Sequence, residues 1–431
     1  MKLEADLLVE NAAQVVTLKA SPGSTDAEGK LGVIPDGTVA AKDGRIVWVG
    51  PADQTAWKVS LLPRGKELDA SGRVVMPGFI DSHTHLLFAG TREREFEMRL
   101  QGASYQEIAA KGGGIKSTVE KTRRAGREEL VAAGKKNLDS MLSLGTTTVE
   151  AKTGYGLSTK DEIKMLEALA ELGREHPVEV VPTFLGAHEI PPEYSGKAEE
   201  YVRLLIEEMI PAVAEKKLAR FCDVFCEKGV FSPEQSRRIL ETGKRYGLLP
   251  KLHADELTPL GGAELAAEIG AVSADHLLFI SEKGMEAMAE KGVVATLLPG
   301  TAFFLFLGRY APARQMISRG VTVALATDFN PGSCMTESLP LITTIACTQM
   351  RMTPAEAILG ITLHAARALR QEKEVGSLEP GKQADLVVLD IPDYRHLSYH
   401  FGVNHAWKVV KKGRLAWEAE SAHSTLRVDP R

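Results

Sequence analysis

Apolar runs and amphipathic segments alternate along the middle of the chain. The runs are short, as is typical of buried strands, and the segments between them repeat apolar residues at helical spacing. Strands that alternate with helices predict a parallel sheet. The predicted strands span residues 74–80, 146–151, 178–185, 221–225, 249–253, 272–276, 293–297 and 322–327.

Helical patterns lie between most of these strands and continue after the last one. Eight strands with such helices, in roughly 250–300 residues, predict an α/β fold of the (β/α)8, TIM-like barrel type. A doubly wound open sheet is the alternative, but no Gly-x-Gly-x-x-Gly follows the first strand. The predicted helices span residues 161–172, 198–215, 233–246, 261–268, 282–291, 311–319, 337–350 and 354–369.

Both ends of the chain are predicted to be β-rich. Asp43-Gly44 is a strong hairpin-turn signal between two short strands near the N-terminus, and further strand candidates follow residue 385. We expect residues 1–73 and 371–431 to form one small composite β-sandwich, with the catalytic barrel at 74–370 inserted between them. Two unrelated small β pieces are the alternative.

Composition and charge place the chain among ordinary globular proteins. Its 431 residues are 44% hydrophobic and 25% charged, and the net charge of −5 gives no reason to expect nucleic acid binding. No signal-peptide pattern and no run long enough to cross a bilayer is present, so we expect a cytoplasmic protein without a membrane partner. The four cysteines, without zinc-ribbon spacing, suggest a reducing compartment, and the pair Cys222 and Cys226 is expected in the core.

Polar and ionisable residues follow the predicted strands where each one ends. Because the C-terminal ends of barrel strands meet at one face, these residues are expected at one level. Core packing explains a single histidine, but it does not explain this repetition. The residues are His83 and His85, Lys152 and Tyr155, His188, His253 and Glu256, His276, and Asp328.

The motif His83-Thr84-His85 directs two imidazoles to the same face, because side chains alternate along a strand. Alone, the motif fits a hydrogen-bonded surface pair equally well. Together with His253 and Asp328 it predicts a site for one divalent or trivalent metal ion per subunit, zinc or iron, with an open position for water. Such an ion supplies hydroxide near neutral pH.

Glu256 lies three residues after His253, just past the strand end. It is placed to exchange protons with the water and the leaving group, and its alternative role is that of a surface-loop carboxylate. His276 could polarise a substrate carbonyl or stabilise its oxyanion. Asp328 could bind the metal and also accept a hydrogen bond from the water, so we count it as catalytic too.

The chain resembles the amidohydrolase superfamily. The likeness lies in Pro-Gly-Phe-Ile-Asp-Ser-His-Thr-His at 77–85, the later histidines and aspartate at strand ends, the flanking β-rich termini and the motif at 376–390. The spacing His253-x-x-Glu256 is similar to the mononuclear, deaminase-like branch. Binuclear members use a carboxylated lysine on a middle strand to bridge two metal ions. Because Lys152 lies at a strand end, the number of metal ions stays open on this point. We favour one metal, with Lys152 hydrogen-bonded to nearby groups or simply structural.

A closer resemblance is to the imidazolonepropionase family of histidine degradation, carried by residues 88–105, 112–115, 150–157, 183–188 and 326–333. It implies that 4-imidazolone-5-propanoate is hydrolysed to N-formimidoyl-L-glutamate. Arg92 would then bind the propionate, although by itself it fits a solvated arginine in a charged run. The resemblance implies that the substrate-binding residues are Arg92, Tyr155, His188, Glu256, Asn330, Gly332 and Ser333.

Two other functions stay open at this stage. An aminohydrolase of a heterocyclic base such as cytosine or guanine would use the same metal site but release ammonia. A non-catalytic barrel would hold the metal in a closed site without water. We also expect a small anionic heterocyclic substrate, a homodimer, and a flexible active-site loop at residues 111–115.

Overall fold

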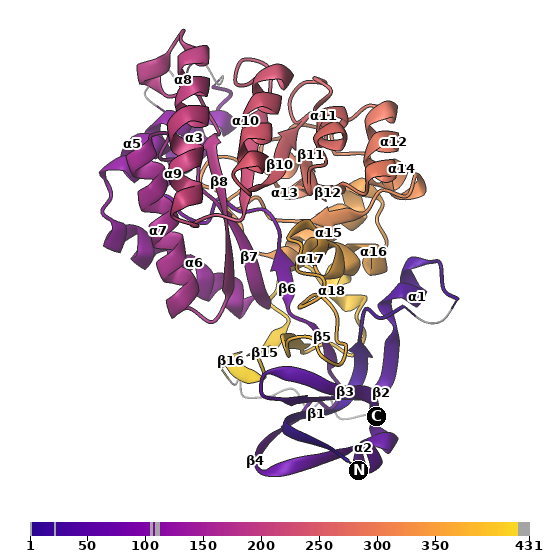
Figure 1. Cartoon of the computed structure of the whole chain (residues 1–431). Helices are drawn as coiled ribbons and strands as arrows, with labels where there is room; N and C mark the ends of the chain where they lie inside the picture. Colours follow the sequence, from indigo (N-terminus) through magenta and orange to yellow (C-terminus); the bar gives the residue numbers. More distant parts are fainter. Residues whose placement is uncertain (1, 21–22, 104–106, 108–112, 421–431) are drawn as a thin grey trace.

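A parallel eight-stranded barrel forms the larger part of the molecule (Figure 1). The computed structural model describes residues 2–20, 23–103, 107 and 113–420. Every neighbouring pair in the barrel sheet is parallel. In chain order its strands are β6 (Phe79–Asp81), β7 (Thr146–Lys152), β8 (Glu179–Ala187), β9 (Phe221–Cys226), β10 (Leu249–Ala254), β11 (Ser273–His276), β12 (Val294–Leu297) and β13 (Val323–Leu325).

The residues just beyond β13 and β6 bring the two edge strands of this sheet together. The Asp328 amide donates to the carbonyl of His83 (3.0 Å), and the His85 amide donates to the carbonyl of Phe329 (2.9 Å). These backbone bonds nearly close the barrel. They also place the segment that carries the two first histidines beside the segment that carries Asp328, although 243 positions separate Asp328 from His85 in the sequence.

Helices surround the barrel, and their buried faces belong to one large core with the strands (Figure 1). The predicted helix 198–215 contains a π-helical turn (Leu205–Met209) between α8 and α9. The helices are α3 (Glu93–Leu100), α5 (Ile115–Arg124), α6 (Arg127–Ser143), α7 (Thr159–Glu175), η1 (Pro192–Tyr194), α8 (Ala198–Leu204), α9 (Ile210–Glu215), α10 (Pro233–Arg245), α11 (Gly262–Ile269), α12 (Glu282–Lys291), α13 (Pro299–Phe304), α14 (Ala313–Ser318), α15 (Leu339–Met350), α16 (Pro354–Gly360) and α17 (Leu363–Ala368).

The two ends of the chain share a second sheet, seen in Figure 1 as indigo and yellow strands at one end of the molecule. Its hydrogen-bonded order is β16-β15-β14-β5-β1-β2-β3, with β4 paired to β1. Asp43 and Gly44 have φ of 51° and 79°, as the predicted tight turn requires. The elements are β1 (Leu3–Val16), α1 (Ala27–Leu31), β2 (Val33–Lys42), β3 (Arg45–Pro51), α2 (Ala52–Lys58), β4 (Val59–Asp69), β5 (Val74–Pro77), β14 (Leu386–Leu389), α18 (His396–Tyr399), β15 (Ala406–Lys411) and β16 (Arg414–Glu418).

The predicted strand at 74–80 is wrong in one respect, because the structure divides it into β5 and β6. β5 pairs with β14 in the terminal sheet, whereas β6 pairs with β7 in the barrel. Gly78 lies between them, where a Cβ atom would come within 2.3 Å of the Thr147 side chain. A continuous apolar run hides this division because both halves are buried. We keep the domain boundaries at 73/74 and 370/371 as a proposal.

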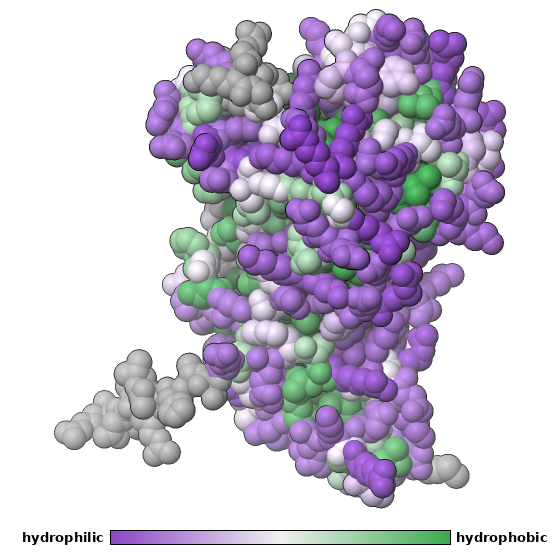
Figure 2. All heavy atoms as spheres, turned by 90° about the vertical axis from the view of Figure 1, so that its left-hand side faces the viewer, coloured by the Kyte–Doolittle hydropathy of each residue, from purple (hydrophilic) through white to green (hydrophobic). Residues whose placement is uncertain are grey.

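Hydrophilic residues cover most of the face in Figure 2, with hydrophobic residues in separate patches. No helix in the described part of the chain is long and apolar enough to cross a membrane. All four cysteines are free, and Cys222 and Cys226 are buried in the core as predicted. The predicted flexible loop at 111–115 falls partly outside the described residues: Lys111 and Gly112 lie outside, and Ile115 begins α5.

Candidate active site

The C-terminal ends of the barrel strands bring the predicted residues together. His83 and His85 follow β6, His253 lies on β10, His276 ends β11, and Asp328 follows β13. Ligand atoms of two sets lie within 4.8 Å of one another. The first set is His83, His85 and His253, and the second is His83, His276 and Asp328. The structure therefore gathers the four predicted ligands and adds His276 next to them.

The chemistry of these donors fits a metal ion. The Nε2 atoms of His83 and His253 are buried and have no hydrogen-bond partner among the described residues. Oδ1 of Asp328 lies 3.4 Å from Nε2 of His83 and 3.5 Å from Nε2 of His85. Imidazole nitrogens and one carboxylate are ligands that suit zinc and iron. A buried, unpaired polar atom is otherwise costly, so a bound cation would stabilise this arrangement.

Carboxylates lie beside the Nδ1 atoms of two of these rings, on the side opposite Nε2. Nδ1 of His83 lies 2.7 Å from Oδ2 of Asp275, and Nδ1 of His253 lies 3.1 Å from Oδ2 of Asp223. The hydrogen bond fixes the tautomer of His83 and leaves its Nε2 for a metal, while Asp223 makes an ion-pair contact with His253. The sequence interpretation gave neither aspartate a role. The signal was present, since Asp223 stands alone in the apolar strand Phe-Cys-Asp-Val-Phe-Cys.

Burial controls the charge state of the site. It lowers the pKa of His83, His85 and His276 well below the usual value, which keeps these rings neutral and able to bind a metal. Burial also opposes the charged form of His253, but the adjacent Asp223 carboxylate raises its pKa overall. Burial raises the pKa of Asp328 to about 6, against the hydrogen bond that Thr301 donates to it (2.6 Å).

Glu256 is fixed by its two neighbours in the sequence. The Asp255 carboxylate accepts backbone hydrogen bonds from the start of α11, and the Glu227 carboxylate accepts one from the Leu257 amide (2.9 Å). Oε2 of Glu256 lies 3.5 Å from Nε2 of His276. Burial, and then the charge of Asp328, raises the pKa of Glu256 to about 8. Glu256 is thus a buried carboxyl group beside His276 and not a surface carboxylate.

Arg92 stands where α3 begins, with only a small part of its side chain exposed. Its guanidinium donates from Nε to Oε2 of Glu95 (2.9 Å), and Nη2 lies 2.8 Å from the same oxygen. A Cβ atom on Gly332 would come within 2.1 Å of Nη1 of Arg92. The glycine in the loop after β13 therefore leaves room for the arginine. Arg92 at the start of α3 and Gly332 in the loop after β13 are therefore neighbours, and both are predicted substrate-binding residues.

His188 and Tyr155 line the histidine cluster from the neighbouring strands. The His188 ring stacks on His85, with centroids 4.7 Å apart and planes 13° apart. The Tyr155 ring centre lies 5.7 Å from that of His85. The buried Glu162 carboxylate holds the Tyr155 loop by accepting hydrogen bonds from the amides of Gly156 (2.8 Å) and Leu157 (2.9 Å). Both residues predicted to contact substrate therefore lie against His85, one of the candidate metal ligands.

Asn330 organises its own loop. Its Oδ1 accepts from the amides of Gly332 and Ser333, both at 2.8 Å, while its Nδ2 donates to the carbonyl of Asp328 and to Oγ of Ser333, both at 2.7 Å. These four bonds use all the hydrogen-bonding capacity of the amide. The Asn330 side chain therefore fixes the positions of Gly332 and Ser333 in this loop.

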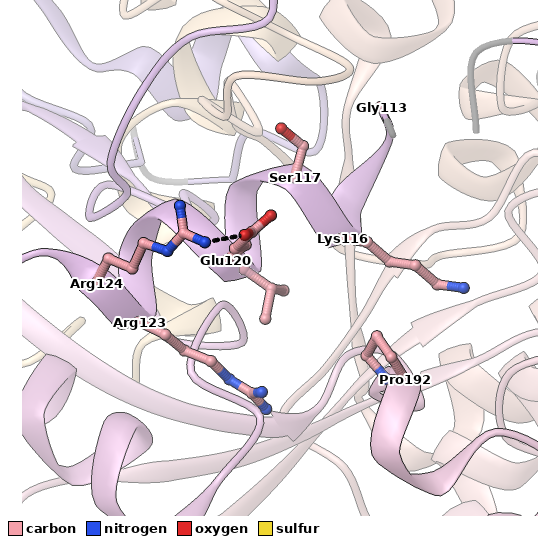
Figure 3. Close-up of a pocket in the computed structure, with 8 residues that line it drawn as sticks. Gly113, Lys116, Ser117, Glu120, Arg123, Arg124 and Pro192 are labelled. Carbon is pink, nitrogen blue, oxygen red and sulfur yellow. Dashed lines mark hydrogen bonds and ion pairs between the residues drawn. The ribbon is translucent and has the colours of Figure 1, made fainter. Parts of the chain in front are cut away.

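A surface pocket of about 430 Å³ lies along α5, outside this cluster (Figure 3). Arg124 pairs there with Glu120, and Arg123 donates to the carbonyl of Gly156 (2.6 Å). Arg123 therefore supports the loop that carries Tyr155. None of the predicted catalytic, metal-binding or substrate-binding residues lines the pocket, although Gly113 of the predicted loop at 111–115 does. Its lining residues are Gly113, Lys116, Ser117, Val119, Glu120, Arg123, Arg124 and Pro192.

Comparison with known proteins agrees with this geometry. The amidohydrolase family model matches residues 74–416, which is most of the chain. The chain therefore belongs to the amidohydrolase family.

Two relatives narrow the assignment. Over 411 residues the chain is 54% identical to the imidazolonepropionase of Symbiobacterium thermophilum, covering 95% of this chain and 97% of the relative. It is 53% identical over 413 residues to the imidazolonepropionase of Geobacillus kaustophilus, with the same shares covered. Within the amidohydrolases, the chain is a member of the imidazolonepropionase family, as its sequence motifs predicted.

Solved structures with the same fold are more distant. Guanine deaminase from E. coli superposes with a TM-score of 0.73 at 16% identity, covering 96% of this chain and 99% of that one. An adenosine deaminase from Xanthomonas campestris with bound zinc gives 0.70 at 20% identity, covering 96% and 93%. At these identities the likeness shows the fold alone, a barrel with a flanking terminal sheet.

Proposed function

We propose that the protein hydrolyses the ring C–N bond of 4-imidazolone-5-propanoate and releases N-formimidoyl-L-glutamate, a step of histidine catabolism. One observation carries the proposal: a metal-suited group of buried histidines and Asp328 lies at the barrel mouth, in a chain 54% identical to an imidazolonepropionase. The unpartnered Nε2 atoms support a hydrolytic metal centre rather than a packed core.

His83, His85, His253 and Asp328 would hold one zinc or iron ion. When bound, such an ion lowers the pKa of a water molecule toward neutrality and polarises a carbonyl. His83 and His253 present their Nε2 atoms inward because Asp275 and Asp223 occupy their Nδ1 sides. His85 is positioned by its stacking on His188.

Glu256 moves the proton in this scheme. As the carboxylate it accepts a proton from the attacking water, and as the acid it returns a proton to the departing ring nitrogen. His276, next to Glu256, stabilises the negative charge that develops on the carbonyl oxygen. Asp328 accepts a hydrogen bond from the water and helps to orient it. Attack at the carbonyl carbon then opens the ring without loss of an amino group.

Arg92 supplies the charge that the propionate needs. Its Nε and Nη2 are paired with Glu95, so the guanidinium is held in one orientation while its Nη1 points along Gly332. An arginine fixed in this way binds a carboxylate with defined geometry. Tyr155 and His188 would contact the ring, and the loop with Asn330, Gly332 and Ser333 would close the site on the substrate.

The direct test uses metal-analysed protein and 4-imidazolone-5-propanoate. The imidazolone absorbance should disappear, formimidoylglutamate should form in equal amount, and no ammonia should appear. Ammonia release from a heterocyclic amine, with no ring opening of the imidazolone, would favour the aminohydrolase alternative. If fully metal-loaded protein catalyses neither reaction, the non-catalytic barrel is the interpretation that remains.

We further propose a cytoplasmic homodimer. All four cysteines are free, which fits a reducing compartment. The methionine- and leucine-rich helices of the chain could support the dimer that the sequence analysis expects. Light scattering coupled to size exclusion would measure the mass, and a value near the 46.7 kDa of one chain would rule the dimer out.

A further inference from the structure

A cluster of five charged side chains lies beneath the histidines with no exposed side-chain surface. We call it the buried charge cluster. Two lysines and three carboxylates form it, and no role in the proposed reaction uses them directly. Charged groups are rarely buried so fully unless they are paired, because desolvation costs several kcal/mol for each ion. The members are Glu150, Lys152, Asp223, Lys251 and Asp275.

Lys152 is the member of the cluster that contacts both aspartates lying beside the candidate metal ligands. Its Nζ lies 2.7 Å from Oδ2 of Asp223 and 3.3 Å from Oδ2 of Asp275. These are the same two oxygen atoms that face Nδ1 of His253 and Nδ1 of His83. A third contact, 3.1 Å to Oε1 of Glu150, completes the surroundings of the ammonium. One cation therefore touches both carboxylate oxygens that orient the candidate metal ligands.

We propose that Lys152 is a positioning residue that holds the side chains of Asp223 and Asp275 in place behind His253 and His83 and thereby sets the affinity of these two histidines for the metal ion. This inference rests on the metal site of the proposed function. It assigns a role to the strand-end lysine that the sequence left open.

Electrostatics explains the effect. Each aspartate keeps the Nε2 atom of its imidazole directed toward the metal site only while its own oxygen stays beside Nδ1. Burying these charges is costly, and the short contacts of the Lys152 ammonium with Asp223 (2.7 Å) and Asp275 (3.3 Å) offset that cost. Without the Lys152 charge, Asp223 and Asp275 would have no lysine partner among the described residues, because Lys251 pairs with Glu150 alone. The two carboxylates would then move apart, and the imidazoles would lose their orientation.

The same cluster argues against a carboxylated lysine. Carboxylation would convert Lys152 into an anion next to Glu150, Asp223 and Asp275, all within 3.3 Å of the present Nζ atom. Four buried anions in contact would repel one another strongly. Lys152 is thus an ammonium behind the ligands, and the site holds one ion.

Lys251 provides a matched control. It is equally buried and pairs with Oε2 of Glu150 at 2.6 Å and with the carbonyl of Ser82 at 3.3 Å. Within the described residues it forms no ion pair with either histidine-facing aspartate. Lys251→Met therefore removes a similar buried charge without touching Asp223 or Asp275. A general cost of charge removal should affect both lysine variants alike.

The experiment measures zinc affinity of the stripped full chain against a chromophoric chelator, for the unaltered protein, Lys152→Met and Lys251→Met. We expect Lys152→Met to weaken zinc binding by about 10–100-fold, the usual effect of losing an outer partner of a ligand. Lys251→Met should stay within about threefold. Cobalt-substituted protein should show an altered visible spectrum in Lys152→Met only. Equal affinities and spectra in the two variants would overturn the inference.

Two further measurements keep the test decisive. If Lys152→Met does not fold, Lys152→Gln replaces it, because the amide keeps a donor toward Asp223 but lacks the charge. Asp223→Asn is then made alone and with the lysine change. If Lys152 acts through Asp223, the double variant should lose less affinity than the product of the two single losses. A loss equal to that product would contradict the proposed role.

The outcomes separate this inference from the proposed function. Protein that binds one equivalent of zinc, loses affinity in Lys152→Met and never opens the imidazolone would support the positioning role while refuting the function. If the protein is active and its Lys152→Met variant binds zinc with unchanged affinity, the proposed function is supported and the positioning role is refuted. Two equivalents of metal bound to the unaltered protein would also overturn the inference, because Lys152 would then act as a bridging ligand.

Discussion

Nδ1 of His83 lies 2.7 Å from Oδ2 of Asp275, and neither side chain has any exposed surface. The pair joins the end of β11 to the first histidine motif across 192 positions of sequence. It leaves Nε2 of His83 as the nitrogen that faces Asp328. A hydrogen bond in the protein interior therefore determines which nitrogen of His83 is available to a metal.

Asp275→Asn should weaken zinc binding by about 10–100-fold, because the neutral amide no longer fixes the His83 tautomer. A chelator competition titration measures this. Asp139→Asn is the control, since Asp139 lies 3.2 Å from Nε2 of His176 in an exposed pair far from the site. Unchanged zinc affinity in Asp275→Asn would show that the buried contact does not orient the ligand.

Glu256→Gln should retain the metal and lose roughly 10²–10⁴-fold in kcat, the range typical of acid-base groups. The substitution keeps the shape of the side chain but removes its ability to accept a proton. Metal analysis and steady-state kinetics on the same preparation measure the two effects. Glu290→Gln, on the exposed face of α12, is the control. Turnover within a few-fold of normal in Glu256→Gln would remove Glu256 from the mechanism.

The pH profile should show an acidic limb that belongs to Glu256. Burial and the charge of Asp328 raise its pKa from 4.5 to about 8. A base must be ionised, so kcat/KM should rise with pH as Glu256 loses its proton. A bound cation favours the carboxylate, so the limb is expected between 4.5 and about 8. The residual activity of Glu256→Gln should lack this limb, and its persistence would assign it to another group.

Arg92→Gln should lower kcat/KM for the anionic substrate by roughly 10–100-fold, mostly through KM. A hydrogen bond to a charged group contributes about 1.5–3 kcal/mol, and each 1.4 kcal/mol is a factor of ten. Arg94→Gln is the control because Arg94 is exposed on the same helix. Equal KM values for the two variants would show that Arg92 does not bind the propionate and is only a solvated residue at the start of α3.

The junction between the two sheets should be sensitive to one methyl group. A Cβ atom at Gly78 would come within 2.3 Å of the buried Thr147 side chain, so Gly78→Ala should destabilise the protein by about 1–3 kcal/mol. Gly173 in α7 is exposed, and its nearest neighbour to a new Cβ would lie at 3.7 Å. Gly173→Ala should be neutral or stabilise by up to about 1 kcal/mol. Denaturant unfolding of both variants measures the contrast.

The sequence by itself determined the barrel and most of the residues at its mouth. Alternation of apolar runs and helical segments specifies a parallel sheet, and a closed parallel sheet brings all strand ends to one face. The histidines and Asp328 could therefore be predicted as neighbours before any distance was known. The Asp43-Gly44 turn was equally readable, because its chemistry is local.

Tertiary structure alone decided how those residues are held. The run at 74–80 divides between two sheets because its halves find different partners, β14 and β7, and nothing in the apolar pattern distinguishes them. Lys152 meets Asp223 and Asp275 only because three strands place them in contact. Local patterns record which residues are apolar or ionisable, whereas the pairing of buried charges depends on contacts between distant segments, which exist only once the chain has folded.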